Sequence, residues 1–272
     1  MSSAFILAAQ QHVLAADTPT PQTARRSLRD LWLSYSEAPV LDHWLEYAEH
    51  YERHFPRPDG TPRKLLEIGV QSGGSARAWK QFYGAPLTYV GIDINEPCRR
   101  TQSVEEKIFV EIGSQLNGTF LRGVCDKHGP FDMVVDDGGH SYNMMGFSVE
   151  TLFSHPTCLS ADAVYTIEDM HTMSMCAQGY CDEPSQIYNI VGRAFGGMHK
   201  HWFAKSHQVG RAPSPWAAQV RALSLYDSIA FFQRGPKLRQ LTRVIRGTDK
   251  LPNGPGDEAS RHEAPVDRGD KD

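Results

Sequence analysis

Residues Lys64–Ser75 read KLLEIGVQSGGS, an apolar run followed by closely spaced glycines. Such a run is typical of a buried β-strand, and glycine allows the backbone to turn sharply and to approach a ligand closely. In parallel sheets with helical crossovers, ligands bind in the crevice beyond the carboxyl ends of the strands. The stretch therefore predicts a first strand, a tight turn at the edge of a binding crevice, and a helix that starts near Ser75.

The same alternation of strand-like and helix-compatible segments continues towards the C-terminus. The strand-like runs are Lys64–Val70, Thr88–Ile94, Ile108–Ile112, Phe131–Val135 and Ala163–Ile167, and the helical segments between them are Ser75–Tyr83, Ser114–Lys127 and Tyr142–Phe153. This alternation predicts βαβ units and a parallel sheet with helices on both faces. Two further β-rich runs, Arg221–Tyr226 and Ser228–Gln233, predict a closing antiparallel hairpin at the sheet edge.

The flanks of this region divide the chain into three parts. Residues 1–60 form an N-terminal extension, in which apolar positions at helical spacing predict an amphipathic helix over Leu41–Phe55 that ends before Pro56. Residues 61–246 form the main domain, and the long gap at 170–215 predicts a lid insertion. Residues 247–272 are charged and poor in large apolar side chains, so we expect a disordered tail.

The overall composition limits the class of partner. The 272 residues include 28 lysines and arginines and 32 aspartates and glutamates, which gives a net charge of −4. This balance argues against a nucleic-acid or anionic-membrane binder. The apolar run Ala4–Ala9 is far shorter than the roughly 18 residues that a membrane span needs. We expect a soluble protein with a small-molecule partner, and the sequence leaves open whether it forms a homo-oligomer.

The cysteines bear on the compartment. The chain contains five, Cys98, Cys125, Cys158, Cys176 and Cys181, an odd number without a CxxC pair. Such a set argues against a disulfide framework and against a structural zinc site. Free cysteines fit a reducing compartment, so we expect a cytoplasmic protein.

The spacing of the glycines narrows the choice of ligand. Gly69 and Gly73 do not match the G-x-G-x-x-G fingerprint of dinucleotide-binding turns. The pattern E-x-G-x-x-x-G, which begins at Glu67, instead resembles the adenosylmethionine turn of class I methyltransferases. Asp93 ends the second predicted strand, where a carboxylate can accept both ribose hydroxyls of an adenosyl group. Each element alone is compatible with an ordinary turn or strand end, but together they favour an adenosyl pocket.

Acidic pairs follow the fourth and fifth predicted strands. Asp136 and Asp137 come directly after the fourth strand, and Glu168 and Asp169 follow the fifth. In the methyltransferase strand order these strands are neighbours, so Asp137, Glu168 and Asp169 converge at one edge and repel one another unless a cation compensates. Oxygen ligands suit Mg²⁺ better than zinc. A single acidic pair is commonly a solvated strand end or a helix cap, whereas two adjacent pairs favour a metal site.

His140 follows the acidic pair after a Gly-Gly turn and is the candidate general base. Its unperturbed pKa near 6.5 suits proton removal at neutral pH. The alternative interpretation is an ordinary surface histidine. Strand pleating turns Asp136 away from Asp137, so Asp136 is expected to contact cofactor or backbone.

Taken together, these motifs resemble one known family. The segments ExGxxxGGS, GIDI, Glu111–Gln115, FDxVVDDGGH and IEDxHT are similar to those of macrocin/mycinamicin-type sugar O-methyltransferases, over about Leu65–Gly235. The resemblance implies Mg²⁺ dependence, with Asp137, Glu168 and Asp169 as metal ligands and His140 as the catalytic residue. It implies adenosylmethionine contacts at Glu67, Gly69, Gly73, Ser75, Asp93, Gln115 and Asp136.

The expected fold is α/β: a Rossmann-like class I methyltransferase with a seven-stranded, mostly parallel sheet and a C-terminal antiparallel hairpin. The expected function is Mg²⁺-dependent methyl transfer from S-adenosylmethionine to a hydroxyl of a sugar, glycoside or small polyol. Two alternatives are an adenosylmethionine-binding regulatory protein without turnover and a hydroxylase-like member of the wider group. The sequence shows no two-histidine, one-carboxylate pattern that would support the hydroxylase.

Overall fold

The structure is a computed structural model that describes residues 26–180, 187–199 and 214–235. The expected tail at 247–272 lies outside the described residues, as do residues 1–25 of the N-terminal extension. The expected lid at 170–215 is described only in part.

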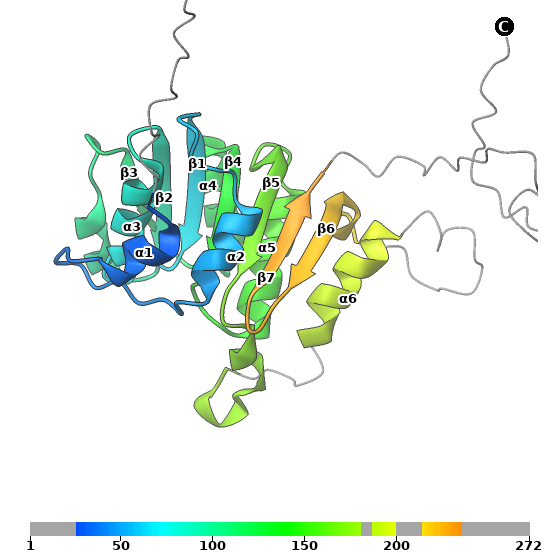
Figure 1. The fold of residues 1–272 in the computed structure, drawn as a ribbon. Helices are drawn as coiled ribbons and strands as arrows, with labels where there is room; N and C mark the ends of the chain where they lie inside the picture. Colours follow the sequence, from blue (N-terminus) through cyan, green and yellow to red (C-terminus); the bar gives the residue numbers. More distant parts are fainter. Residues whose placement is uncertain (1–25, 181–186, 200–213, 236–272) are drawn as a thin grey trace, which may run out of the picture.

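Seven strands form one sheet (Figure 1). They are β1 (Arg63–Ile68), β2 (Leu87–Asp93), β3 (Ile108–Ile112), β4 (Phe131–Asp136), β5 (Leu159–Ile167), β6 (Val220–Leu225) and β7 (Ala230–Arg234). The order is β3-β2-β1-β4-β5-β7-β6, with β7 antiparallel to both neighbours and the pairs from β3 to β5 parallel. The predicted mostly parallel sheet with a closing hairpin is confirmed.

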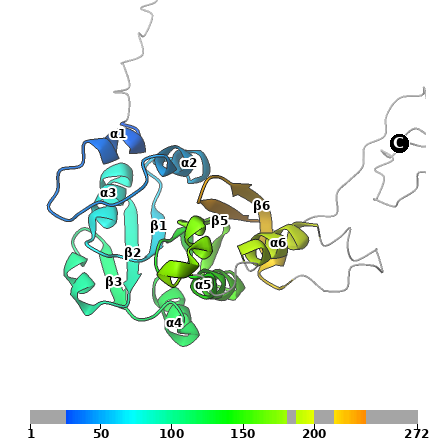
Figure 2. The ribbon, with the colours of Figure 1, turned by 90° about the horizontal axis from the view of Figure 1, so that it is seen from below.

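Helices cover both faces of the sheet (Figure 2). One face carries α1 (Leu28–Leu33), α2 (Tyr47–His54) and α3 (Gly74–Tyr83), and the other carries α4 (Gly118–His128) and α5 (Tyr142–Ser154). Helix α6 (Ile187–Met198) packs beside β6 and the 3₁₀ turn η4 (Ala217–Gln219). Asn117 and Ser141 cap α4 and α5 with their side-chain oxygens, which explains where these helices begin. Short 3₁₀ segments complete the chain: η1 (Glu96–Thr101), η2 (Met170–Ser174) and η3 (Cys176–Gln178).

The two layers of core follow the period-2 alternation of the strands. In β1, Leu65 packs into the layer under α1–α3, whereas Leu66 packs into the layer under α4 and α5. In β4, Met133 and Val135 face the first layer and Val134 faces the second. All five side chains are buried, so the strands read as continuous apolar runs.

The N-terminal extension differs from the expectation. The predicted helix over Leu41–Phe55 begins only at Tyr47, and residues 41–44 are not helical. The side chains of Trp44 and Tyr47 bond to Asp169 at the carboxyl edge of the sheet, and this tertiary contact overrides the local helical spacing. Helix α1 has no counterpart in the sequence predictions, and β5 begins at Leu159 rather than at Ala163.

The expectation of free cysteines holds for Cys98 but is wrong for three other cysteines, Cys125, Cys158 and Cys176. Cys125 at the end of α4 and Cys158 at the start of β5 form a disulfide, and Cys176 is also disulfide-bonded. The fold brings α4 to the segment just ahead of β5 and so joins two cysteines that are 33 positions apart, with no sequence pattern to mark the pair. The argument for a reducing compartment therefore loses its basis. None of the described helices is both long and apolar enough to cross a bilayer.

Candidate active site

A cavity of about 670 Å³ opens at the carboxyl ends of the parallel strands. Segments that follow β1, β2, β3, β4 and β5 form its wall, together with residues 40–44 ahead of α2. Its lining includes these predicted site residues: Gly69, Ser75, Asp93, Gln115, Asp137, His140, Glu168 and Asp169. The same cavity thus joins the glycine turn to the carboxylate cluster.

The glycine turn requires glycine at Gly69 for two reasons. Its φ of +96° lies in the left-handed region, and a Cβ there would stand 2.2 Å from the carbonyl oxygen of Asp137. The backbone N–H of Asp137 also donates to the carbonyl of Ile68 at 3.0 Å. The turn after β1 and the segment after β4 are therefore in direct backbone contact, which leaves no room for a side chain.

Asp93 lines the cavity at the end of β2, and its carboxylate organises the wall. One oxygen accepts from the backbone N–H of Val70 at 2.9 Å and of Gln71 at 3.0 Å, and the other accepts from the backbone of Asn95 at 2.8 Å. Burial acts to raise the pKa of Asp93, but these hydrogen bonds outweigh burial and lower it. Both oxygens already have protein donors, a feature that the sequence does not reveal.

Three predicted cofactor contacts, Glu67, Gly73 and Asp136, lie behind the cavity wall. Glu67 is fully buried and accepts hydrogen bonds from the hydroxyls of Ser75 and Tyr89. Burial raises the pKa of Glu67. Its side chain lies on the α3 side of the sheet, so it supports the turn from beneath rather than lining the cavity.

Asp136 also lies outside the lining. It accepts from the hydroxyl of Tyr165 at 2.8 Å and from Nε2 of Gln115 at 3.3 Å. Burial raises its pKa to about 7. Gln115 in turn accepts from the backbone N–H of Gly139 at 2.6 Å, so this buried pair holds the Gly-Gly turn ahead of His140. Gly73 is the N-cap of α3 and likewise lies outside the lining.

The three predicted metal ligands do not form one compact group. Among the described residues, the potential ligand atoms gather in two overlapping sets, each with all its atoms within 4.8 Å of one another. One set is His43, Asp137 and Glu168, and the other is Asp137, His140 and Asp169. Asp137 is common to both, so the site is centred on this carboxylate.

The charge at Asp137 is costly in the absence of a cation. Burial is the largest cause that raises its pKa well above the ordinary range, followed by repulsion from Glu168, Glu67 and Asp169. Among the described residues, the main influences on this pKa are burial and other carboxylates, and no hydrogen bond to the Asp137 side chain stands among them. A divalent cation would remove the conflict.

The other two acids are tied to the N-terminal layer. Glu168 accepts a hydrogen bond from the hydroxyl of Tyr51, which is fully buried. Asp169 has a φ of +52°, and its Oδ1 accepts from Trp44 Nε1 and from the Tyr47 hydroxyl, both at 3.0 Å. These donors fix one oxygen of each carboxylate and leave the other oxygen free for a ligand.

His140 lies between two of the acids. Its Nε2 is 3.9 Å from Asp137 Oδ1 and 4.0 Å from Asp169 Oδ2, and its Nδ1 is buried without a hydrogen-bond partner. Burial lowers the pKa of His140, although Asp169 and Glu168 act in the opposite direction. A neutral imidazole at this position can accept a proton from a group bound beside Asp137.

The sequence predictions miss one part of the site, the segment ahead of α2. His43 and Trp44 line the cavity, and Tyr47 and Tyr51 hold Asp169 and Glu168. Burial acts to lower the pKa of His43, but Glu168 above all outweighs burial and raises it. One signal was present: a buried tyrosine hydroxyl needs an acceptor, so Tyr47 and Tyr51 indicate polar partners within the core.

Known proteins with similar sequences are macrolide and polyketide O-methyltransferases. The chain is 29% identical over 246 residues to demethylmacrocin O-methyltransferase of Streptomyces fradiae, covering 85% of this chain and 58% of that protein. It is 30% identical over 205 residues to mycinamicin VI 2''-O-methyltransferase of Micromonospora griseorubida, covering 71% and 48%. The chain thus spans about half the length of the curated relatives that it matches. No family model matches the sequence.

Solved structures give the same result. The MycE methyltransferase of the mycinamycin biosynthetic pathway, in complex with Mg and SAH, superimposes with a TM-score of 0.65 at 27% identity over 78% of this chain and 55% of that one. A complex of MycE with Mg, SAH and mycinamycin VI gives a TM-score of 0.64 at 26% identity over 79% of this chain and 55% of that one. From these matches, the strand order and the shared site motifs, we conclude that the chain belongs to the macrocin/mycinamicin-type O-methyltransferase family.

Proposed function

We propose that this protein transfers a methyl group from S-adenosylmethionine to a sugar hydroxyl of a glycosylated small molecule, in a reaction that depends on Mg²⁺. The observation that carries the proposal is the shared cavity, which contains the turn after β1, Asp93, the acidic cluster and His140. A cofactor and an acceptor that bind in one cavity are held close together, as methyl transfer between them requires.

The residues fit an adenosyl cofactor. The turn at Gly69 presents backbone without a side chain, and Asp93 stands beside it at the end of β2. Ser75 and Gln115 complete the polar lining on this side. Glu67, Gly73 and Asp136 support this wall from behind, so their role is to position it.

The residues also fit a divalent cation. Asp137, Glu168 and Asp169 offer carboxylate oxygens as ligands. The negative charges of these side chains repel one another, and a bound cation would relieve this repulsion. When bound, Mg²⁺ would lower the pKa of a coordinated hydroxyl, and S-adenosylmethionine would supply the methyl group.

Two residues of the chain, His140 and Gln115, account for proton removal and for the position of the base. His140 removes the hydroxyl proton at Nε2, the nitrogen that faces Asp137 and Asp169. Its lowered pKa keeps the imidazole neutral and ready to accept that proton at neutral pH. Gln115 holds the Gly139 backbone and thereby the approach of His140 to the cavity.

The acceptor class rests on the relatives. Their names describe O-methylation of demethylmacrocin, of mycinamicin VI and of 8-demethyl-8-alpha-L-rhamnosyl tetracenomycin-C. A sugar hydroxyl is a weak acid that needs both a cation and a base for activation, and the cavity offers residues for both. We therefore assign a glycosylated natural product or a simple glycoside as the acceptor.

A methyl-transfer assay tests the proposal. The full chain is incubated with S-adenosylmethionine labelled in its methyl group and a panel of glycosides, with Mg²⁺ or with EDTA. The proposal expects label on a sugar oxygen in the Mg²⁺ reactions and little or none with EDTA. Cofactor binding without transfer to any acceptor would favour a regulatory protein, and a product that gains oxygen instead of a methyl group would favour a hydroxylase.

A further inference from the structure

His43 is a buried histidine whose inward nitrogen has no hydrogen-bond partner. Its side chain is 3% exposed, and Nδ1 makes no hydrogen bond. Buried polar atoms in folded proteins nearly always have a partner, and an exception commonly marks a missing ion or ligand. The residue lies in the non-helical segment ahead of α2, which lines the cavity at the carboxyl ends of the strands.

The position of the imidazole is fixed by packing. The ring of His43 stacks on Trp32 with a centroid distance of 4.7 Å and an interplanar angle of 12°. Trp32 belongs to α1 and is itself buried with Leu28 and Leu31. The N-terminal layer therefore directs Nδ1 towards the acids, as a supporting shell does for a metal-binding histidine.

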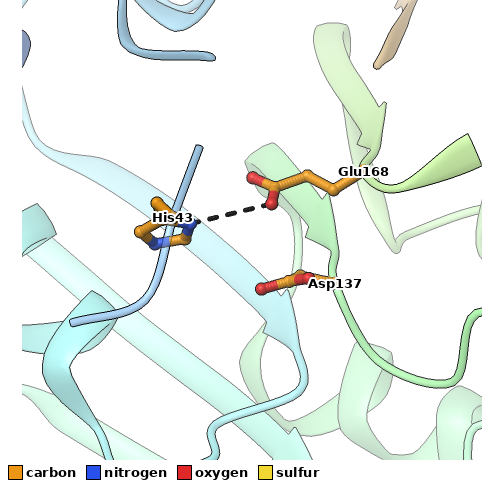
Figure 3. A group of neighbouring side chains, drawn as sticks. All are labelled: His43, Asp137 and Glu168. Atoms are coloured by element: carbon orange, nitrogen blue, oxygen red, sulfur yellow. Dashed lines mark ion pairs between the residues drawn. The ribbon is translucent and has the colours of Figure 1, made fainter. Parts of the chain in front are cut away.

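The distances between His43, Glu168 and Asp137 fit three side chains that bind one metal ion better than they fit direct hydrogen bonds. Figure 3 shows His43 beside Glu168, which follows β5, and Asp137, which follows β4. Nδ1 lies 3.7 Å from Glu168 Oε2, which is longer than the donor–acceptor distance of about 2.7–3.2 Å in ordinary hydrogen bonds. Two atoms that each stand about 2.1 Å from one metal ion lie up to about 4.2 Å apart. The ligand atoms of His43, Asp137 and Glu168 all lie within 4.8 Å of one another, close to this range.

The hydrogen bonding of Glu168 and Asp137 also supports a shared metal ion. Glu168 uses Oε1 to accept from Tyr51, so Oε2 remains for the side where His43 stands. Among the described residues, no hydrogen bond stands among the main influences on the Asp137 carboxylate, and this side chain belongs to both potential ligand sets. One imidazole nitrogen and two carboxylates thus lie around a common point, where His43 Nδ1 and Glu168 Oε2 form a long ion pair and a bound cation would replace the proton on His43.

We propose that His43 Nδ1 is a ligand of the metal bound by Asp137 and Glu168, so that the site has a mixed nitrogen and oxygen donor set. Such a set binds first-row transition cations such as Mn²⁺ or Co²⁺ more tightly than it binds Mg²⁺. The inference rests on the metal site of the proposed function and deepens it by naming a ligand and a metal preference. It also gives the segment ahead of α2 a direct role in the site.

Manganese binding to the full chain tests the inference without turnover. Pulsed electron paramagnetic resonance of the Mn²⁺-loaded protein detects a directly bound imidazole through its nitrogen coupling. The wild-type protein should show this coupling, and His43→Gln should lose it while its Mn²⁺ affinity falls about 10–100-fold. Affinity for Mg²⁺ should fall by about threefold or less, because Mg²⁺ relies on oxygen ligands.

Two variants serve as controls. His140→Ala removes the other histidine beside Asp137 and should keep the nitrogen coupling. His50→Gln changes a histidine that stacks on Tyr226 away from the cavity, and it should leave both coupling and affinity unchanged. Coupling that survives in His43→Gln and disappears in His140→Ala would overturn the inference, because His140 would then be the ligand.

The wild-type spectrum decides the matter even if His43→Gln does not fold. Mn²⁺ that binds without nitrogen coupling in the wild-type protein overturns the assignment of His43, whatever the methyl-transfer assay shows. Methyl transfer in the absence of such coupling leaves the proposed function intact. Nitrogen coupling without methyl transfer supports His43 and counts against the proposed function alone.

Discussion

Trp44 Nε1 donates a hydrogen bond to Asp169 Oδ1 at 3.0 Å, although the two residues lie 125 positions apart in the sequence. The Tyr47 hydroxyl donates to the same oxygen at 3.0 Å. Together they hold a carboxylate whose backbone adopts a left-handed conformation, with a φ of +52°. The N-terminal segment is therefore part of the site, and its effect on metal binding can be measured.

Removal of one of these donors should weaken metal binding. We expect Tyr47→Phe to lower Mg²⁺ affinity about 10-fold, because supporting partners of ligating carboxylates typically contribute that much. Isothermal titration calorimetry measures the change. Tyr35→Phe is the matched control, since it deletes a hydroxyl that bonds to the carbonyl of Pro39 rather than to the site. Equal Mg²⁺ affinity in Tyr47→Phe and the wild-type protein would remove Tyr47 from the metal-binding machinery.

The close approach at Gly69 predicts a large and specific cost for a methyl group. Gly69→Ala places a Cβ 2.2 Å from the backbone of Asp137, whereas Gly60→Ala meets nothing within 4 Å. Both positions have a left-handed φ, so both variants pay about 1–2 kcal/mol for that conformation. Chemical denaturation should show a clearly larger loss of stability for Gly69→Ala, together with weaker metal binding. Equal losses in the two variants would show that the contact does not constrain the turn.

The raised pKa of Asp136, about 7, predicts a pH effect on stability. The folded protein holds a proton that the unfolded chain releases near its ordinary pKa of about 4. This contribution is therefore complete below pH 4 and is lost as the pH rises to 7. The wild-type unfolding free energy, relative to that of Asp136→Asn, should fall by about 2–3 kcal/mol between pH 5 and 7 in EDTA. A constant or rising difference would mean that Asp136 is ionised in the folded state.

The fold could be predicted from the sequence because its signals are local. Each central strand is an apolar run between glycines or polar residues, and the helix predicted from Tyr142 begins there, after its cap Ser141. The helix predicted from Ser114 begins only at Gly118, because Asn117 caps it. The acids after β4 and β5 were found because the carboxyl ends of adjacent parallel strands must share an edge. These inferences need no knowledge of distant packing.

The remaining features depend on contacts between distant parts of the chain. The segment containing His43 reads as the first turn of a helix, and only the packing of α1 and α2 on the sheet brings it to Glu168. The pairing of Cys125 with Cys158 likewise depends on the fold, which brings α4 to the segment just ahead of β5. Glu67 precedes the turn at Gly69 and Asp136 precedes the Gly-Gly turn ahead of His140, but the pleat directs both side chains behind the wall, towards Tyr89 and Tyr165.

Asp137 is proposed to hold the metal and His140 to remove the substrate proton, and a rescue experiment separates these two roles. Methyl transfer is measured for Asp137→Asn and His140→Ala over a range of Mg²⁺ concentrations. Asp137→Asn loses one anionic ligand, so it should bind Mg²⁺ more weakly and recover part of its activity at high Mg²⁺. His140→Ala should bind Mg²⁺ and S-adenosylmethionine almost normally and lose about 10²–10⁴-fold in turnover. Its activity should not return with added Mg²⁺, whereas restoration by Mg²⁺ would contradict the account and make His140 a metal ligand.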